Sequence, residues 1–240
     1  MKCIVLAAGY ATRLHPVAKY VPKPLLDMGG KPMIDYIISK VRELGVTDIC
    51  VVTNQTFYPL FAQWGSDHRV QVINDGTTSN ENRRGAVGDL LLGLETLGDD
   101  DYLIVGGDNL CEDNLKELHA TGHKHRAVTI GLYNVQSMEH AKRFGVVTCE
   151  QGRVKSFVEK PTDPQSTLIS TLVYFLPKES LPRVRAFAKQ GKDNSGELIM
   201  HLMEHLPVHG VTLNGKWVDI GSLEHLENTR QEFREGKWQV

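Results

Sequence analysis

The sequence has no excess of charge of one sign, no long apolar run and no leader-like start. Its 27 Lys and Arg residues nearly balance 29 Asp and Glu, for a formal net charge of −2, so no basic field points to nucleic acid as a partner. No apolar stretch reaches the roughly 18 residues of a membrane span, and no charged start with a long apolar run marks a signal peptide. We therefore expect no nucleic-acid partner, no membrane partner and a cytoplasmic location.

Cysteine is also scarce and unpatterned. The chain has Cys3, Cys50, Cys111 and Cys149, with no C-x-x-C pair, and most of them lie in or beside apolar runs. This pattern favours buried free thiols over a metal site or a disulfide. Free thiols fit a reducing compartment.

Neither the Walker nor the Rossmann glycine motif is present, but another phosphate-binding pattern is. The apolar run Ile4–Leu6 predicts a buried strand, and the small residues of the stretch 7–11 follow it directly. A loop of small residues lets free N–H groups approach a phosphate. Arg13 and Lys23 add two cations nearby, and together these features indicate a triphosphate site. The alternative is a plain turn beside two solvated surface cations.

The rest of the chain alternates between predicted strands and helices. Helices are expected over 33–44, 57–64, 85–97, 114–122, 181–189, 198–205 and 223–234, and strands over 48–54, 70–74, 102–109, 127–132, 144–149, 154–160, 168–176, 211–213 and 217–220. The β-α-β order predicts parallel strands with right-handed crossovers. We expect a single α/β domain over residues 1–240, with a Rossmann-like mixed, mostly parallel sheet and helices on both faces. Nucleotide binding would fall to residues 1–125 and acceptor binding to 126–240.

Two acidic residues follow predicted strands. Asp108 comes after Gly106 and Gly107, at the strand end where open α/β sheets bind ligands. Asp219 lies in the late strand that begins at Trp217. Each could simply cap the helix that follows. The functional interpretation is a pair of Mg²⁺ ligands, because carboxylates suit a hard cation that is bound together with phosphates.

Four strings taken together resemble the sugar-phosphate nucleotidyltransferases, a family that includes glucose-1-phosphate thymidylyl- and uridylyltransferases and related cytidylyltransferases. They are L-A-A-G-x-x-T-R-L-x-P followed by P-K-P-L-L, a strand ending in G-D, F-V-E-K-P, and W-x-D-x-G. They extend from Ile4 to about Leu226, so the resemblance covers nearly the whole chain.

The resemblance implies transfer of a nucleotidyl group from an NTP to a phosphorylated acceptor, with Mg²⁺ as cofactor and release of pyrophosphate. Arg13, Lys23 and Asp108 would be catalytic, and Asp108 and Asp219 would hold the metal. The nucleotide-binding residues would be Leu6, Ala8, Gly9, Tyr10, Ala11, Thr12, Arg13, Lys23, Asn80, Gly85 and Asp108. The acceptor-binding residues would be Gly145, Glu159, Lys160, Thr171 and Leu172. A homo-oligomer is compatible with the resemblance.

Three departures from the family pattern leave the base and the acceptor open. Ala11 stands where the family usually has a second Gly, which it can replace if its φ is negative. Leu172 stands where Gly would leave room for a sugar ring, and it could face either the pocket or the core. The Gln that precedes the base-side glycine in thymidylyltransferases is absent from residues 77–82. A CTP-dependent enzyme acting on a non-sugar phosphate, such as phosphocholine or a polyol phosphate, is therefore the alternative.

Two rival functions and two ambiguous segments remain. A nucleotide-sensing relative without turnover would be expected to lose Lys23 or an Asp, and both Asp residues and Lys23 are present. A glycosyltransferase would use a D-x-D motif, which residues 99–101 contain, although a solvated turn is favoured there. His119, His123 and His125 could bind metal, but a solvated helix end is favoured. The polar segment 75–84 is either a mobile surface loop or a lid that contacts the base.

Overall fold

The computed structural model describes the whole chain, residues 1–240. The strands of the main sheet are β1 Lys2–Leu6, β4 Ile49–Thr53, β5 Gln71–Asn74, β6 Tyr102–Gly106, β8 Val128–Asn134, β9 Gly145–Glu150, β10 Arg153–Glu159, β11 Leu168–Leu176 and β12 Val208–Leu213. They form one nine-stranded sheet in the order β5-β4-β1-β6-β11-β8-β12-β10-β9. Two small ribbons pair β2 (Asp27–Met28) with β3 (Lys31–Pro32) and β7 (Asn109–Cys111) with β13 (Trp217–Asp219).

The sheet is mixed, as predicted. The strands β5, β4, β1 and β6 are mutually parallel, and so are β8 and β12. The strand β11 runs antiparallel to both β6 and β8, while β10 runs antiparallel to β12 and β9. Parallel pairing therefore dominates only the N-terminal half. Because β11 comes from the second half of the sequence and lies beside β6, one sheet spans both halves.

The helices are α1 Met33–Glu43, α2 Tyr58–His68, α3 Gly85–Leu97, α4 Lys116–His125, α5 Met138–Ala141, α6 Leu181–Ala188, α7 Ser195–Met203 and α8 Leu223–Arg234. Each predicted helix is present, with ends shifted by a few residues. The one-turn helix α5 was not predicted, because four residues are too few to show helical periodicity. The strand predicted over 102–109 divides at Gly107 into β6 and β7.

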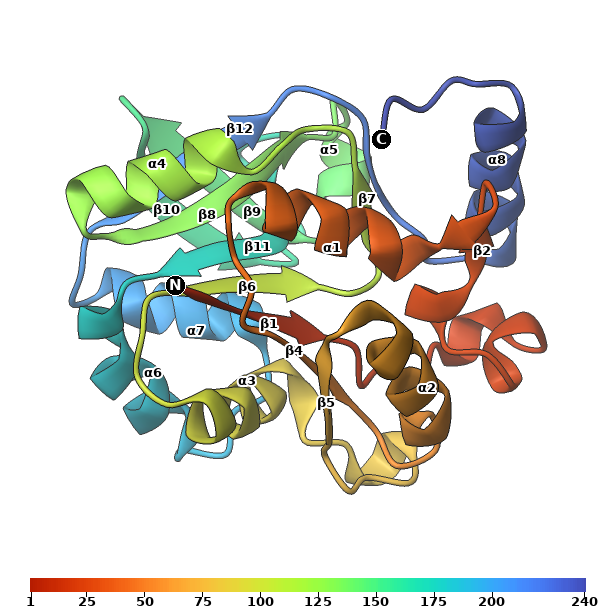
Figure 1. Cartoon of the computed structure of the whole chain (residues 1–240). Helices are drawn as coiled ribbons and strands as arrows, with labels where there is room; N and C mark the ends of the chain where they lie inside the picture. The colour runs from red at the N-terminus through yellow and green to blue at the C-terminus, as the bar shows by residue number, and fades with distance from the viewer.

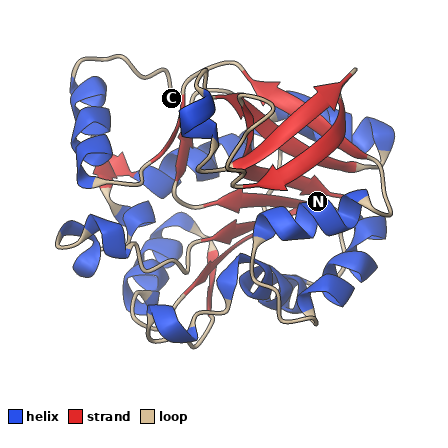
Figure 2. Ribbon diagram, turned by 180° about the vertical axis from the view of Figure 1, so that it is seen from behind, coloured by secondary structure: helices blue, strands red, loops and turns tan.

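Alternating strand residues build a core on each face of the sheet. In β1, Ile4 faces α3, α6 and α7, while Cys3 and Val5 face α1, α2 and α4. Figure 1 shows these two groups of helices on opposite sides of the strands. Figure 2 shows from behind that the strands form one layer between them. The predicted placement of helices on both faces is confirmed.

A third core joins the two ends of the sequence. Leu14 and Met28 from the N-terminal segment pack with Leu226 of α8 and with Ile220. In Figure 1, α8 stands at the edge of the molecule beside β2. This core anchors both the segment that carries Arg13 and Lys23 and the strand β13.

The cysteines are free, as predicted, and all but the half-buried Cys149 are buried. Burial raises the pKa of Cys50 to about 12, which keeps that thiol protonated. None of the helices combines the length and the apolar character that crossing a membrane requires.

Candidate active site

The loop after β1 is fixed from beneath by buried polar residues. Leu6 of β1 is in register with Gly106 of β6, so the loops that follow these parallel strands leave the same edge of the sheet. At the end of β4, the fully buried side chains of Thr53 and Asn54 donate hydrogen bonds to the carbonyl oxygens of Ala7 (3.4 Å) and Ala8 (3.0 Å). Our sequence analysis did not identify these two residues. The signal was there, since both are polar and end an apolar strand.

The same loop contains a left-handed residue. Ala11 has φ 45° and ψ 39°, so the condition under which Ala would replace the family's Gly without strain, a negative φ, is not met. This conformation suits glycine, and a residue with a Cβ adopts it at a cost of about 1 kcal/mol. The left-handed backbone thus explains why the family usually has glycine at this position. Ala11 adopts the same turn, and its Cβ makes that conformation less stable.

A buried lysine joins the two predicted metal ligands. The β7–β13 ribbon pairs Asp219 with Asn109, which places Asp219 next to Asp108. The Lys23 Nζ lies 3.0 Å from Asp108 Oδ2 and 2.6 Å from Asp219 Oδ1. Burial alone would lower the pKa of Lys23, but the two carboxylates outweigh it and raise the pKa. The ammonium group is therefore charged, and the three groups together carry one net negative charge.

These groups border a cavity of about 580 Å³. Its lining includes every residue predicted to bind nucleotide, together with Asp219 and Leu172. The predicted nucleotide residues that line it are Leu6, Ala8, Gly9, Tyr10, Ala11, Thr12, Arg13, Lys23, Asn80, Gly85 and Asp108. The cavity thus brings together residues that lie up to 102 positions apart in the sequence, from Leu6 to Asp108. The contacts of these residues with a nucleotide stay predictions.

The segment 75–84 is an ordered loop with internal hydrogen bonds. The buried Asp75 accepts hydrogen bonds from the backbone N–H (2.7 Å) and the hydroxyl (2.8 Å) of Thr77. The Thr77 hydroxyl also lies 3.0 Å from the hydroxyl of Tyr10, which connects this loop to the loop after β1. Ser79 and Asn82 form a reciprocal capping box around a single 3₁₀ turn. Asn80 reaches the cavity from this turn.

The predicted acceptor residues of β9 and β10 form a second group. Gly145 opens β9 and is in register with Glu159 at the end of β10. A Glu159 oxygen accepts a 3.3 Å hydrogen bond from Asn194, and the other oxygen lies 3.1 Å from where a Cβ on Gly145 would stand. Lys160 is mostly exposed, with its Nζ 3.7 Å from Glu159. None of these three predicted residues lines the 580 Å³ cavity.

A bulge in β11 separates the other two predicted acceptor residues. The register against β8 shifts between Ser170 and Tyr174. Thr171 points into the sheet, where its buried hydroxyl donates to the Gly131 carbonyl (3.0 Å). The Thr171 side chain is thus occupied within the sheet and does not line the cavity, and acceptor binding by this residue stays a prediction.

Leu172 is the residue that faces the cavity. It adopts φ 54° within the bulge and lines the cavity, while part of its side chain packs on the core around α3. The bulge explains why strand alternation could not place this side chain, because an extra residue reverses the faces that follow.

The other clusters noted in the sequence have structural roles. Asp99 pairs with Arg185, and Asp101 pairs with Arg126 at 2.6 Å, so the D-x-D string forms surface ion pairs. His123 packs on the ring of Phe175. His119 lies beside His123, whereas His125 stacks on His209. The three predicted histidines thus do not converge.

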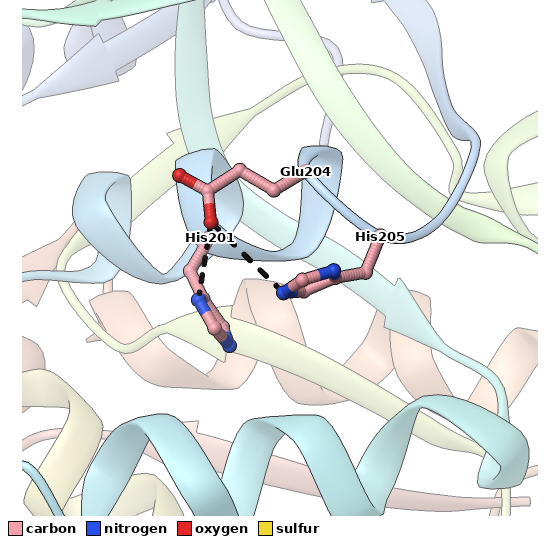
Figure 3. A group of neighbouring side chains, drawn as sticks. All are labelled: His201, Glu204 and His205. Carbon is pink, nitrogen blue, oxygen red and sulfur yellow. Dashed lines mark ion pairs between the residues drawn. The ribbon is translucent and has the colours of Figure 1, made fainter.

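A different group, His201, Glu204 and His205, does converge. Its possible ligand atoms lie within 4.8 Å of one another at the end of α7. Figure 3 shows both imidazoles turned toward one carboxylate oxygen of Glu204, at 3.7 Å and 4.0 Å. The H-x-x-E-H spacing could have revealed this group from the sequence. None of the three lines the 580 Å³ cavity, and Glu204 is largely exposed, so this group lies apart from the candidate site.

Comparison with known proteins decides the family. The profile of the Nucleotidyl transferase family matches residues 2–236. The chain belongs to this family. A glucose-1-phosphate thymidylyltransferase of Neisseria meningitidis is 32% identical over 244 residues, which cover 94% of this chain and 80% of the relative. A mannose-1-phosphate guanyltransferase of Schizosaccharomyces pombe is 28% identical over 230 residues, which cover 92% and 61%.

Some relatives are longer than this chain, so the match covers a smaller share of their length. A bifunctional protein GlmU of Methanocaldococcus jannaschii is 27% identical over 224 residues, which cover 92% of this chain and 51% of that protein. The chain thus spans only about half to three fifths of some relatives. A solved UDP-glucose pyrophosphorylase in complex with UDP-glucose aligns with a TM-score of 0.82 at 21% identity, over 98% of both chains. That likeness shows the fold.

Proposed function

We propose that this nucleotidyl transferase family member moves an NMP group from an NTP to a phosphorylated acceptor of the sugar-1-phosphate type and releases pyrophosphate. The observation that carries the proposal is the meeting of Lys23, Asp108 and Asp219 at a cavity lined by the loop after β1. A nucleotide-sensing relative would need neither the two carboxylates nor a buried lysine between them.

The reaction is an in-line displacement at the α-phosphorus. A phosphate oxygen of the acceptor forms the new P–O bond, while the bond from the α-phosphorus to the bridging oxygen of the β-phosphate breaks. The acceptor phosphate is already ionised near neutral pH, so no strong general base is required. Negative charge develops on the leaving pyrophosphate, where Arg13 and Lys23 would stabilise it. The Arg13 side chain is exposed at the cavity and has no hydrogen-bond or ion-pair partner within the chain, so it is free to contact phosphate.

The donor set fits a magnesium ion. Asp108 and Asp219 converge on one point, and the single charge of Lys23 leaves one of their two negative charges unbalanced. Hard cations favour such carboxylates and complete their shell with phosphate oxygens and water. A bound Mg²⁺ would neutralise phosphate charge and polarise the α-phosphate. Lys23 would then balance the carboxylates and keep them in place.

The acceptor would lie between Leu172 and the group on β9 and β10. Lys160 would bind its phosphate and Glu159 its hydroxyl groups. Leu172 favours a second candidate, because a branched side chain at the cavity leaves less room for a hexose ring. That candidate is a cytidylyltransferase for a smaller non-sugar phosphate. A homo-oligomer stays a prediction.

The test is a pyrophosphate-release screen of ATP, CTP, GTP, UTP and dTTP against sugar-1-phosphates, polyol phosphates and phosphocholine. We expect release that requires one NTP, one acceptor and Mg²⁺ together, with an NDP-linked product by mass spectrometry. Omitting the acceptor is the control, since hydrolysis alone would release phosphate or pyrophosphate without that product. Failure of every pair to form an NDP-linked product would overturn the proposed function.

A further inference from the structure

Three side chains of metal-ligating type converge at the end of α7, away from the candidate active site. His201 lies in the last turn of the helix, and Glu204 and His205 follow in the turn after it. The backbone N–H groups of His205 and Leu206 both donate to the Leu202 carbonyl, at 3.1 Å and 2.8 Å, so the helical winding continues through this turn. Positions i, i+3 and i+4 of a helix share one face. The backbone itself therefore brings these three side chains together.

Packing holds the inner imidazole of this group in place. The His201 ring stacks on Phe187 of α6, with ring centroids 5.2 Å apart, and the His201 side chain is only 21% exposed. The His205 ring meets the His201 ring edge-on, also at 5.2 Å. His201 is therefore a fixed ligand. The side chains of His205 and Glu204 are 40% and 68% exposed, so an ion can reach the group from solvent.

The separations within the group suit a shared ion better than direct contact. His201 Nδ1 and His205 Nε2 lie 3.7 Å and 4.0 Å from the same Glu204 oxygen, Oε2 (Figure 3). Both distances are longer than the roughly 2.7–3.2 Å of an N–H···O hydrogen bond. Two atoms that each lie about 2.1 Å from one tetrahedral Zn²⁺ ion are about 3.4 Å apart. Small side-chain rotations would therefore bring all three ligand atoms onto one ion.

The chemistry of the donors specifies the class of ion. Imidazole nitrogen suits zinc and the neighbouring transition metals, whereas Mg²⁺ prefers a shell made of oxygen atoms. The Glu204 carboxylate supplies a negative charge, and the carbonyl end of α7 adds the negative end of the helix dipole. Three protein ligands leave a fourth position of a tetrahedral ion for water.

We propose that His201, Glu204 and His205 bind a divalent transition-metal ion of the zinc class, with water completing its coordination. The site goes beyond the proposed reaction, because none of its residues lines the 580 Å³ cavity and its ligand differs from the Mg²⁺ expected at Asp108 and Asp219. A bound ion would fasten the turn that leads out of α7 to the helix itself. Because the unfolded chain does not hold the three ligands together, binding stabilises the folded state.

The experiment is a calorimetric titration of the chelator-stripped protein with Zn²⁺ in saturating Mg²⁺. We expect one Zn²⁺ per chain whose binding is at least about tenfold weaker in Glu204→Gln and in His205→Gln, because each variant lacks one ligand. His123→Gln is the matched control, since His123 is a helix histidine of similar exposure (38%) that also lies beside another imidazole. It should leave the affinity unchanged. Zn²⁺ should also raise the Tm of the unaltered protein more than that of the two ligand variants.

A measurement on the unaltered protein keeps the test decisive if a variant does not fold. Zn²⁺ should protect His205 from modification by diethyl pyrocarbonate, read by peptide mass spectrometry, while His123 is modified as before. The inference is overturned if no Zn²⁺ binds, if the ligand variants bind it as tightly as the unaltered protein, or if His205 is modified despite bound Zn²⁺. None of these results bears on the formation of an NDP-linked product, so the proposed function is tested separately.

Discussion

The candidate site has two ends that are built differently. The phosphate end contains Lys23, Asp108 and Asp219 at the loop after β1, and the acceptor end contains Glu159 and Lys160 at the end of β10. At the phosphate end, Lys23 is buried between two carboxylates, and Thr53 and Asn54 fix the loop from below. At the acceptor end, Lys160 is 61% exposed and contacts Glu159 at only 3.7 Å. A preorganised end stabilises developing charge without reorganising, whereas an open end can change its ligand at little structural cost. In the proposed reaction, the phosphate end would therefore fix the chemistry, and the open end would set which acceptor is used.

The largest expected effect is the loss of a carboxylate at the phosphate end. Asp108→Asn and Asp219→Asn should each lower turnover by on the order of 10²–10³-fold, because each variant removes charge from the predicted Mg²⁺ site. The double variant should have nearly the same turnover as either single variant, since each of the three proteins would lack the same ion. Pyrophosphate release at saturating substrates measures this effect.

The control for this pair is Glu95→Gln, an exposed acid outside the cavity, which should leave turnover unchanged. Circular dichroism should show that the Asn variants are folded. If either variant kept near-normal turnover at saturating Mg²⁺, the two residues would not share a metal, and the phosphate end would lose its distinguishing feature.

The second prediction contrasts the two cations of the phosphate end. Lys23→Met and Arg13→Met should each reduce turnover by about 10²-fold. Only Lys23→Met should also lower the free energy of unfolding, by about 1–3 kcal/mol, because it leaves two carboxylates without their partner. Arg13→Met should stay within about 0.5 kcal/mol, as expected for an exposed unpaired residue.

Urea unfolding of both variants separates the two roles. Equal destabilisation by the two substitutions would contradict the contrast between a buried, structural cation and an exposed one that serves only the ligand.

The sequence predicted the phosphate end better than the acceptor end for a physical reason. The loop after β1 is one contiguous string, and its small residues and nearby cations directly indicate phosphate binding. Asp219 joins it through the β7–β13 ribbon, a long-range pairing that the sequence analysis did not predict. The sequence indicated only the role of Asp219, from its predicted strand and from the family resemblance. The β11 bulge and the left-handed Ala11 were not predictable, because tertiary packing sets both.

The third prediction concerns the open end. Lys160→Ala should raise the KM for the acceptor by about tenfold, the lower limit for losing a charged hydrogen bond, because the side chain is largely exposed. NTP binding by calorimetry should be unchanged, and so should stability. Lys155→Ala, at an exposed lysine of β10, the strand that Lys160 directly follows, is the matched control. An equal rise in the KM for NTP would place Lys160 at the phosphate end instead.

The smallest expected effect is at Leu172, where the two ends meet. Its side chain is partly packed and its backbone has φ 54°. Leu172→Gly loses some packing, which lowers the free energy of unfolding. It regains about 1 kcal/mol of that free energy because Gly fits the left-handed conformation. Leu172→Ala loses nearly the same side chain without that gain. In urea unfolding, the Gly variant should therefore be about 1 kcal/mol more stable than the Ala variant, which is the reverse of the usual order.

Activity then shows which acceptor this position selects. If the Leu172 side chain limits the acceptor, both small variants should gain activity with glucose-1-phosphate relative to phosphorylated small alcohols, and they should do so to a similar extent, because both remove the obstructing side chain. If the ratio of the two activities does not move in either variant, Leu172 serves packing alone. The size of the acceptor is then set by the residues of β9 and β10, and the hexose phosphate becomes the better-supported substrate.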